Sequence, residues 1–296
     1  MFDWDDLRCF LAVARGGSTL AGARTLGINQ STVARRLAKF EAELGRKLFE
    51  RAAGGYRLTA LGADVLRSAE EVEKSVAAFA RRAGAADAIA GTLRITCPEP
   101  IVGRLSGSAF MDEFRAEHPE IRVEFVMSDR YLDLAKGEAD VALRSGDVDD
   151  PGLVGTKVAD SVWAVYAARR YADAHGLPAS ASDMAGHTLI GFDGALRENR
   201  AAHWLASVAP GASFAASNTS ILGVLHAVKS GIGVAPLPAA IADAEPDLVR
   251  AFGPVSELTR SWRLLTPADL RHTPRVAAIF DFMVRNRKQL RAILGG

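Results

Sequence analysis

Two neighbouring arginines, Arg35 and Arg36, stand in the segment GINQSTVARRLAKFE, residues 27–41. A guanidinium donates paired hydrogen bonds to phosphate oxygens and to guanine edges, so the pair has the chemistry to hold a nucleic acid. Ser31 and Thr32 come one helical turn earlier, and hydroxyl groups also contact phosphates. An isolated arginine pair is nevertheless typical of a solvated helix face. The elements around the pair therefore decide between the two interpretations.

The first sixty residues predict three short helices. Apolar residues at helical spacing predict a first helix, which follows Asp3, Asp5 and Asp6, residues that suit a helix N-terminus, and ends at Gly16-Gly17. Ser18 is positioned to cap a second helix and Gly27 to stop it. A third is expected over residues 30–44, with Asn29 as its cap. Because a short turn at Gly27 joins the last two helices, the segment predicts a helix-turn-helix.

The third helix has an apolar face formed by Val33, Leu37 and Phe40, which we expect to pack on the core. The polar residues then lie on other faces, mostly away from the core: Ser31, Thr32, Arg35, Arg36 and Lys39. A recognition helix meets base edges with its first turn, where Ser31 and Thr32 stand. The arginines follow one turn later, within reach of bases or flanking phosphates, and Lys39 is also expected to be a DNA-binding residue.

A basic β-hairpin is predicted directly after the third helix. In LGRKLFERAAGGYRLT, residues 44–59, the strand-like runs LFER and YRLT flank a glycine turn. This wing carries four cations: Arg46, Lys47, Arg51 and Arg57. Residues 1–60 hold ten Lys/Arg against six Asp/Glu, although the whole chain has a net charge of only +1. A recognition helix beside a basic wing predicts contact with a polyanion.

A resemblance to the LysR-type transcriptional regulators runs through DLRCFLAVARGGSTLAGARTLGINQSTVARRLAKFEAELGRKLFERAAGGYRLTALG. The resemblance implies a winged helix-turn-helix, a long dimerisation helix and a two-lobed α/β effector domain like the periplasmic binding proteins. Matched by position, it implies DNA contacts from the helix by Gln30, Ser31, Thr32, Arg35 and Arg36. From the wing it implies contacts by Arg51 and Arg57. Ala34 departs from the pattern, since many members have serine there, and this removes a candidate phosphate contact.

A long connecting helix is predicted from Ala60, behind Thr59 as its cap, and no proline interrupts it before Pro98. Its apolar residues are spaced 4, 3, 4, 3, 4, which is a heptad seam: Val65, Ala69, Val72, Val76, Phe79 and Ala83. Such a helix spans roughly 30 Å or more, so we expect the stripe to meet a partner chain. The dimerisation residues are expected to be Val65, Val72, Val76 and Phe79. The following GAADAIAG is expected to be a hinge.

The remaining two hundred residues predict an α/β domain. The β-rich runs TLRIT, IRVEFVMS and ADVALR alternate with helical patterns, and this order implies a parallel sheet. The resemblance adds two lobes between which the chain crosses twice, near residues 160–161 and near Thr266. The expected domains are therefore 1–58 for DNA binding, 59–90 for the linker helix and hinge, and 91–296 for the effector domain. Within it, lobe I comprises about 91–161 and 267–296, and lobe II about 162–266.

Ligands of open α/β sheets bind beyond the carboxyl ends of strands and at helix N-termini. Several polar segments meet that description, and each alone is also compatible with ordinary capping and turn chemistry. Together, in a family that binds effectors between two lobes, they are expected to line one pocket: Cys97, Pro98, Glu99, Pro100, Ile101, Ser128, Asp129, Arg144, Ser145, Asn218, Thr219 and Ser220, with Phe192 as an apolar wall.

Three residues of this expected pocket depart from a simple anion site. Many relatives have Ser or Thr where Pro100 stands, and proline offers neither a hydroxyl nor a backbone N–H. Glu99 adds a negative charge, which Arg144 would offset, so an anionic effector is less secure here than in the rest of the family. Cys97 is expected to be structural, because a redox sensor needs an exposed thiol and often a partner, and Cys9 belongs to the DNA-binding part.

Two other classes of protein fit the sequence less well. A transport-type solute receptor would share the C-terminal fold, but the acidic MFDWDDLRCF lacks a signal core and the winged helix would be unexplained. An α/β enzyme finds no support from a nucleophile elbow, a dinucleotide or P-loop motif, or an HExxH motif. We therefore expect a cytoplasmic, non-enzymatic regulator without metal or cofactor. Its expected partners are operator DNA, a small-molecule effector and itself, as a homodimer and a dimer of dimers; RNA polymerase is a further candidate, and no membrane contact is expected.

Overall fold

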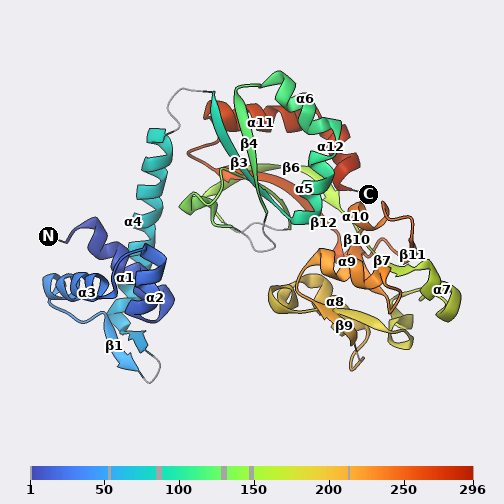
Figure 1. The fold of residues 1–296 in the computed structure, drawn as a ribbon, viewed down its shortest axis with the longest axis horizontal. Coiled ribbons are helices and arrows are strands. Elements are labelled where there is room, and N and C mark those ends of the chain that lie inside the picture. Colours follow the sequence, from blue (N-terminus) through green and yellow to red (C-terminus); the bar gives the residue numbers. More distant parts are fainter. Residues whose placement is uncertain are drawn as a thin grey trace. The chain divides into compact units, whose positions relative to one another are not determined.

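The computed structural model describes residues 2–52, 55–84, 89–127, 132–146, 150–212 and 214–295, with the backbone alone for 81–84. The chain forms two compact units, Met1–Ala83 and Gly84–Gly296, and each is described by itself (Figure 1). Of the predicted hinge, residues 85–88 lie outside the described residues.

The N-terminal unit begins with the predicted helices: α1 (Trp4–Gly16), α2 (Thr19–Leu26) and α3 (Gln30–Leu44). Ser18 caps α2, its Oγ accepting the Ala21 N–H at 3.1 Å. Gly17 and Gly27 end α1 and α2 in the left-handed conformation, as predicted. Asn29 occupies the cap position of α3, but its side chain makes no capping hydrogen bond.

The predicted wing is confirmed as the antiparallel pair β1 (Phe49–Ala52) and β2 (Gly55–Leu58). The Tyr56 N–H donates to the Gly17 carbonyl at 2.8 Å, which ties the hairpin to the turn after α1. Gly55 makes this approach feasible, because a Cβ there would lie 2.4 Å from the Gly17 oxygen. The turn residues 53–54 lie outside the described residues.

The core of this unit gathers one face of each helix. Val33, Leu37 and Phe40 of α3 are buried, as their spacing predicted. They pack with Phe10 of α1 and with Leu48 at the entry to the wing. The connecting helix α4 (Ala60–Gly84) follows, and the Thr59 Oγ1 accepts the Gly62 N–H at 2.9 Å, which confirms the predicted cap.

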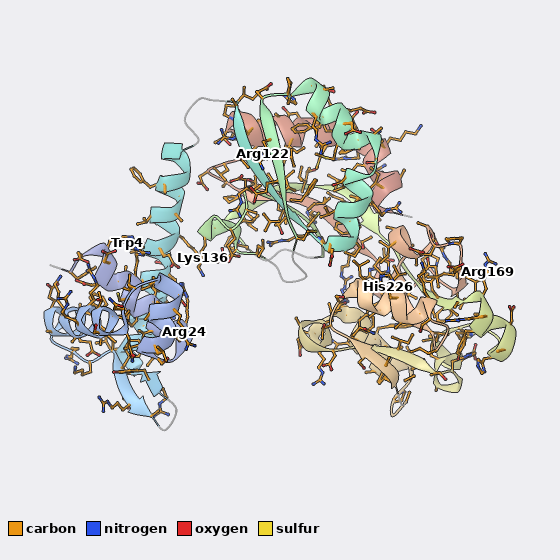
Figure 2. All side chains as sticks on the ribbon, viewed as in Figure 1. Trp4, Arg24, Arg122, Lys136, Arg169 and His226 are labelled. Atoms are coloured by element: carbon orange, nitrogen blue, oxygen red, sulfur yellow. The ribbon has the colours of Figure 1, made fainter. Side chains whose placement is uncertain are left out.

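The C-terminal unit has one five-stranded sheet in the order β4-β3-β5-β12-β6. Its strands are β3 (Gly91–Cys97), β4 (Ile121–Met127), β5 (Val141–Ser145), β6 (Leu153–Ser161) and β12 (Arg260–Pro267). β3 runs parallel to both β4 and β5, which confirms the predicted parallel sheet. β12 adds an antiparallel partner to β5 and β6. β4 is an edge strand, and exposed Arg122 (Figure 2) places a charge there that opposes further pairing.

Helices from both ends of this unit cover lobe I: α5 (Glu99–Ser106), α6 (Ala109–Glu117), α11 (Pro274–Arg285) and α12 (Arg287–Leu294). A single-turn helix, η1 (Leu134–Lys136), precedes β5. Phe110 of α6 and Phe282 of α11 meet edge to face with centroids 4.9 Å apart, although they are far apart in sequence. The C-terminal helices therefore close the same core that α6 begins (Figure 1).

Lobe II holds two smaller sheets, with orders β10-β7-β11 and β8-β9. Its strands are β7 (Trp163–Ala168), β8 (Leu189–Phe192), β9 (Phe214–Asn218), β10 (Ala235–Pro238) and β11 (Leu248–Phe252). Its helices are α7 (Arg169–His175), α8 (Arg200–Val208), α9 (Ile221–Lys229) and α10 (Ala239–Ala242). Short 3-10 turns complete it: η2 (Ala181–Gly186), η3 (Gly194–Glu198) and η4 (Ser256–Leu258). A separate apolar core fills this lobe.

The predicted return to lobe I near Thr266 is wrong. β12 pairs with β6 from Arg260 onward, so the chain has already re-entered the lobe I sheet before Arg260. The position of this return was implied by the family resemblance and not by the local sequence. Pairing with β5 and β6, which lie far away in sequence, places β12 in the lobe I sheet.

Candidate nucleic-acid interface and effector site

The face of α3 that points away from the core carries Ser31 and Arg35, and both are exposed. Thr32 is half-buried between this face and the core. Gln30 is exposed, and its Nε2 donates to Thr19 Oγ1 of α2 at 3.0 Å, which holds the first turn of α3 against α2. These four polar residues all lie in the first two turns of the predicted recognition helix.

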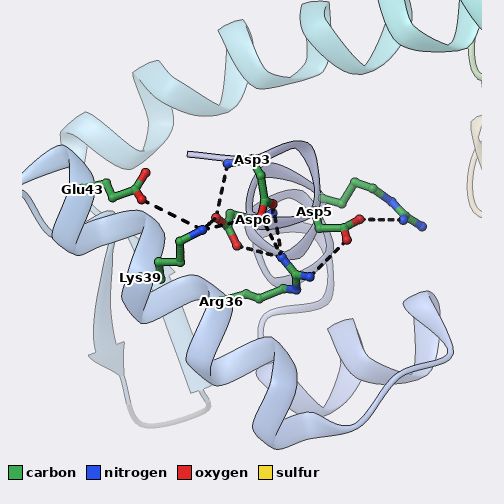
Figure 3. Close-up of polar contacts among 7 residues, drawn as sticks. Asp3, Asp5, Asp6, Arg36, Lys39 and Glu43 are labelled. Atoms are coloured by element: carbon green, nitrogen blue, oxygen red, sulfur yellow. Dashed lines mark hydrogen bonds and ion pairs between the residues drawn. The ribbon is translucent and has the colours of Figure 1, made fainter. Parts of the chain in front are cut away.

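Arg36 and Lys39 lie on another face of α3, towards α1 (Figure 3). Arg36 Nη1 lies 3.1 Å from Asp6 Oδ1, and Lys39 Nζ lies 2.7 Å from Asp6 Oδ2. Neighbouring helical residues point about 100° apart, so Arg35 faces outward while Arg36 faces α1. The expectation that Arg36 and Lys39 contact DNA therefore lacks the geometry that Arg35 has.

The electrostatics of this cluster centre on Asp6, whose side chain is fully buried. Burial alone would raise the pKa of Asp6, but hydrogen bonds from Lys39, the Asp3 backbone N–H and Arg36 outweigh it and lower the pKa below its usual range. The pKa of Asp3 is lowered as well, chiefly by the Asp6 N–H. Sequence reasoning noted these aspartates only as helix N-terminal residues; the Asp-x-x-Asp spacing of a capping box was the missed signal.

On the wing, Arg51 and Arg57 are both exposed, which suits the expected DNA contact. Arg57 Nη2 lies 2.7 Å from Glu50 Oε1 across the hairpin, an exposed pair that water and salt screen. Lys47 is paired differently, with Glu41 Oε2 at 2.6 Å. Arg51 and Arg57 of the wing are therefore exposed, while Lys47 binds the carboxylate of Glu41 near the end of α3.

Glu41 is a buried residue that sequence reasoning missed. Its Oε1 accepts the backbone N–H groups of Leu48 at 2.9 Å and Phe49 at 3.2 Å. Burial by itself raises the pKa of Glu41, and the Lys47 and backbone hydrogen bonds lower it below its ordinary value. One acid near the end of the recognition helix thereby fixes the start of the wing. A lone Glu in a helix gives no sequence signal for such a contact.

The heptad stripe of α4 divides into two parts. Val65 and Ala69 pack against the core of their own unit. Val72, Val76 and Phe79 are exposed, and Phe79 is 74% exposed. A groove of about 300 Å³ runs beside the first part, lined by Phe2, Leu7, Phe40, Leu44, Asp64, Val65, Ser68, Ala69 and Val72. The unpartnered apolar stripe therefore begins near Val72 rather than at Val65, and it is continuous with an apolar groove.

In lobe I, the predicted segments 97–101 and 144–145 lie at the carboxyl ends of the neighbouring strands β3 and β5, where Thr96 pairs with Ala142 in the parallel ladder. Cys97 and Ile101 are buried, Pro98 and Pro100 are half-buried, and Glu99 opens α5 as an exposed residue. Arg144 is buried and its Nη2 donates to the Leu132 carbonyl, so its guanidinium supports the local backbone.

In lobe II, Phe192 pairs with Asn218 in the parallel ladder of β8 and β9. Phe192 is buried, Thr219 is exposed, and the Ser220 Oγ caps α9 by accepting the Gly223 N–H at 3.0 Å. Gly223 leaves room for Asn218, since a Cβ there would lie 2.9 Å from the Asn218 Oδ1. The structure therefore brings 192 and 218–220 together.

The two groups of predicted effector residues approach each other where α5 of lobe I contacts α9 of lobe II. Ser128 and Asp129 lie outside the described residues. Cys97 is buried, and burial raises the pKa of its thiol to about 12. Its thiol is thus kept protonated and shielded, the opposite of a redox sensor.

Within the described parts of the chain, His, Cys, Asp and Glu form no group of three or more suited to a metal ion. No described helix combines the length and the apolar content needed to cross a bilayer.

A winged helix-turn-helix joined to a two-lobed α/β domain defines a DNA-binding regulator with a ligand-sensing domain. The model described as "Bacterial regulatory helix-turn-helix protein, lysR family" matches residues 4–63, and the "LysR substrate binding domain" matches residues 86–288. The second match covers more than half of the chain, so the chain belongs to the LysR-type transcriptional regulators.

Named relatives agree. The regulator CrgA of Neisseria meningitidis serogroup C (strain 8013) is 31% identical over 293 residues, which cover 95% of each chain. The solved structure of CrgA from Neisseria meningitidis has a TM-score of 0.58 and 28% identity, covering 97% of this chain and 99% of that chain. CbnR, solved in full length with its target DNA, has a TM-score of 0.57 and 21% identity over 97% of this chain and 100% of that chain, which extends the likeness in fold.

Proposed function

We propose that this LysR-type regulator reads its operator with Gln30, Ser31, Thr32 and Arg35, and grips the flanking backbone with Arg51 and Arg57 of the wing. The observation that carries the proposal is the outward exposure of Ser31 and Arg35 on a helix whose Val33 and Leu37 are buried. CbnR, a protein of the same fold, was solved in complex with its target DNA, which supports DNA as the partner of this unit.

Binding sites selected from a random DNA pool by the full chain provide the test. Arg35→Ala should weaken binding to the selected duplex and relax the preference at one base position, at a cost of about 1–3 kcal/mol if it contacts a base edge. Arg57→Ala should weaken all duplexes alike, because a phosphate contact carries no sequence information. Unchanged gel-shift titrations for both variants would remove this face from the interface.

We infer that the effector binds where α5 meets α9, between the carboxyl end of β3 and the first turn of α9. The exposed Thr219 hydroxyl and the Asn218 amide offer hydrogen bonds there, and Phe192 offers an apolar wall. Arg144 contributes through the backbone that it holds, and Cys97 and Ile101 through the core beneath. A thermal-shift screen of small metabolites with the full chain tests this site.

A second copy of the chain is the proposed occupant of the exposed stripe on α4. Val72, Val76 and Phe79 together expose an apolar row of the kind that a heptad seam buries. The adjacent groove, which Val65 lines, extends the same surface. We propose a homodimer that forms through this stripe, and dimers that pair into tetramers.

We also propose that the regulator acts in the cytoplasm and has no enzymatic activity. Contact with RNA polymerase is a further proposal for the case in which the regulator activates transcription.

A further inference from the structure

We propose that Arg36 is a positioning residue, which sets the angle of the recognition helix α3 against α1 and leaves the reading of DNA to Arg35. The inference rests on the proposed function, since it assigns a different task to a residue beside the reading face. It also reverses the sequence-based expectation that both arginines contact DNA. The reasons lie in the carboxylates that surround Arg36.

One guanidinium serves three carboxylates of α1 (Figure 3). Arg36 Nη1 lies 3.2 Å from Asp3 Oδ1 and 3.1 Å from Asp6 Oδ1, and Nη2 lies 3.1 Å from Asp5 Oδ2. The rigid fork of an arginine matches such a set of acceptors, whereas a lysine ammonium is a point charge. The side chain of Arg36 is only 29% exposed. Its donors are therefore aimed at α1 and away from solvent.

Asp6 joins the N-terminus of α1 to the cations of α3. Its buried carboxylate accepts Lys39 Nζ at 2.7 Å and the Asp3 backbone N–H at 3.3 Å, and Asp3 Oδ1 accepts the Asp6 N–H at 3.0 Å. The carboxylates that cap α1 are thus the ones that hold α3. If α3 turned away from α1, Asp6 would keep a buried charge without its cations, which is costly. The first turn of α1 therefore sets the orientation of α3.

The local charge argues against a phosphate contact by Arg36. Three aspartates and Glu43, which lies 4.0 Å from Lys39 Nζ, face three cations, Arg8, Arg36 and Lys39. An approaching phosphate would meet more negative than positive charge, so attraction to Arg36 is cancelled locally. Arg35 has no such carboxylates around it among the described contacts, and it is exposed.

A small cavity places Arg36 at the junction of three elements. The cavity has a volume of about 150 Å³ and lies between α1, α3 and the turn that joins α2 to α3. Its walls are Asp5, Arg8, Cys9, Leu26, Ile28, Thr32 and Arg36. Arg36 shares this cavity with Thr32, a candidate reading residue one turn earlier on α3. Because the two residues lie one turn apart on the same side of α3, a change in the angle of α3 at Arg36 also moves Thr32.

The experiment compares Arg36→Met with Arg35→Met in the full chain, because methionine removes the charge and keeps much of the length. Arg67→Met, which removes an exposed arginine paired with Asp64 on α4, is the matched control. Affinities are measured over a series of salt concentrations for two probes, a duplex selected from a random pool by the unaltered chain and a mixed-sequence duplex. Circular dichroism confirms folding.

For Arg36→Met we expect the selected duplex to bind roughly tenfold more weakly, the loss that one misread base pair brings. The mixed-sequence duplex and the salt dependence should be unchanged, because no phosphate contact is lost. If Arg36→Met instead weakens binding to both duplexes alike, and reduces the slope of log binding constant against log salt concentration by about 0.9, Arg36 is a phosphate contact. No change with either duplex would make the cluster merely structural. Both results overturn the proposal.

Asp5→Asn supplies a second route if Arg36→Met does not fold. Asp5 is 51% exposed, and its carboxylate bonds Arg36 without touching the reading face. The ratio of selected to mixed-sequence affinity should fall, and the double variant should fall no further than Arg36→Met, because both act through one contact. An unchanged ratio in Asp5→Asn overturns the proposal. If Arg35→Met also leaves both affinities unchanged, α3 is not the reading helix, and the proposed function fails instead.

Discussion

Oε1 of Glu41, near the end of the recognition helix, accepts the backbone N–H of Leu48 at 2.9 Å, at the entry to the wing. The same oxygen also accepts the Phe49 N–H, and Lys47 holds the other oxygen. The two elements that are proposed to meet DNA are thus joined by one buried carboxylate. Their relative placement depends on it more than on the short hairpin itself.

We predict that Glu41→Ala loosens the wing. Two buried N–H groups lose their acceptor, which costs about 1–3 kcal/mol. Hydrogen exchange of the full chain should show faster exchange at residues 48–49 in this variant. Glu41→Gln is the matched control, because its amide oxygen still accepts these groups, and its loss should be smaller. Equal exchange in Glu41→Ala and the unaltered chain would contradict this role.

Acid should weaken the N-terminal unit, because three of its carboxylates are stabilised in their charged form by the fold. The pKa values of Asp3, Asp6 and Glu41 are lowered in the fold. A group with a lowered folded pKa stabilises the fold above its unfolded pKa, and this contribution is lost as the pH falls through the folded value. The loss should therefore begin below about pH 4, the ordinary range of carboxyl groups.

The measurement for this prediction is hydrogen exchange within α1 and α3 along an acid titration of the full chain. Asp6→Asn, which has no carboxylate to protonate, should flatten the dependence in α1. An Asp6→Asn profile identical to that of the unaltered chain would show that other groups control acid unfolding.

Sequence reasoning predicted those features that depend on local pattern. The helix ends at Gly17 and Gly27 and the caps at Ser18 and Thr59 follow from neighbours within a few residues, and the structure confirms them. The buried face of α3 follows from helical spacing. These interactions are encoded where they occur along the chain.

Features that depend on distant partners could not be predicted in this way. The spacing made Arg35 and Arg36 equivalent, and only the aspartates of α1, some thirty residues away, distinguish them. The strand Arg260–Pro267 was assigned to the wrong lobe because its partners β5 and β6 lie far earlier in the chain. Val65 fitted the heptad spacing, but the core of its own unit lies against that end of α4.

The exposed stripe on α4 predicts that Phe79→Glu weakens self-association. Phe79 is 74% exposed in the single chain, so glutamate there does not disturb the fold. In a dimer seam the same charge would be desolvated without a partner, which is costly. Light scattering should show a loss of mass and gel shifts a loss of operator affinity.

Ser75→Glu is the control for this prediction, because Ser75 is exposed on α4 but is not one of the apolar seam residues. It should keep the mass of the unaltered chain. If Phe79→Glu also keeps that mass, the chains associate through another surface.

The last prediction concerns the proposed effector site. Arg144→Ala is a poor test, because the Arg144 side chain is buried and supports the Leu132 carbonyl, so its removal perturbs the fold.

Thr219 is exposed directly before the cap of α9, and Thr219→Val removes a hydroxyl while keeping the shape. An effector found by thermal shift should bind this variant several-fold more weakly, since one hydrogen bond contributes about 0.5–1.5 kcal/mol. Effector-free DNA binding should not change, because Thr219 lies in the effector domain and outside the proposed DNA-binding face. An effector shifts the balance between two conformations of the chain only by its differential affinity for them. Ser220→Ala separates this effect from helix capping: it removes the bond to the Gly223 N–H and should lower stability by about 1 kcal/mol. Isothermal titration and gel shifts measure both variants, and lost DNA binding with an intact effector response in Thr219→Val would place the effector elsewhere.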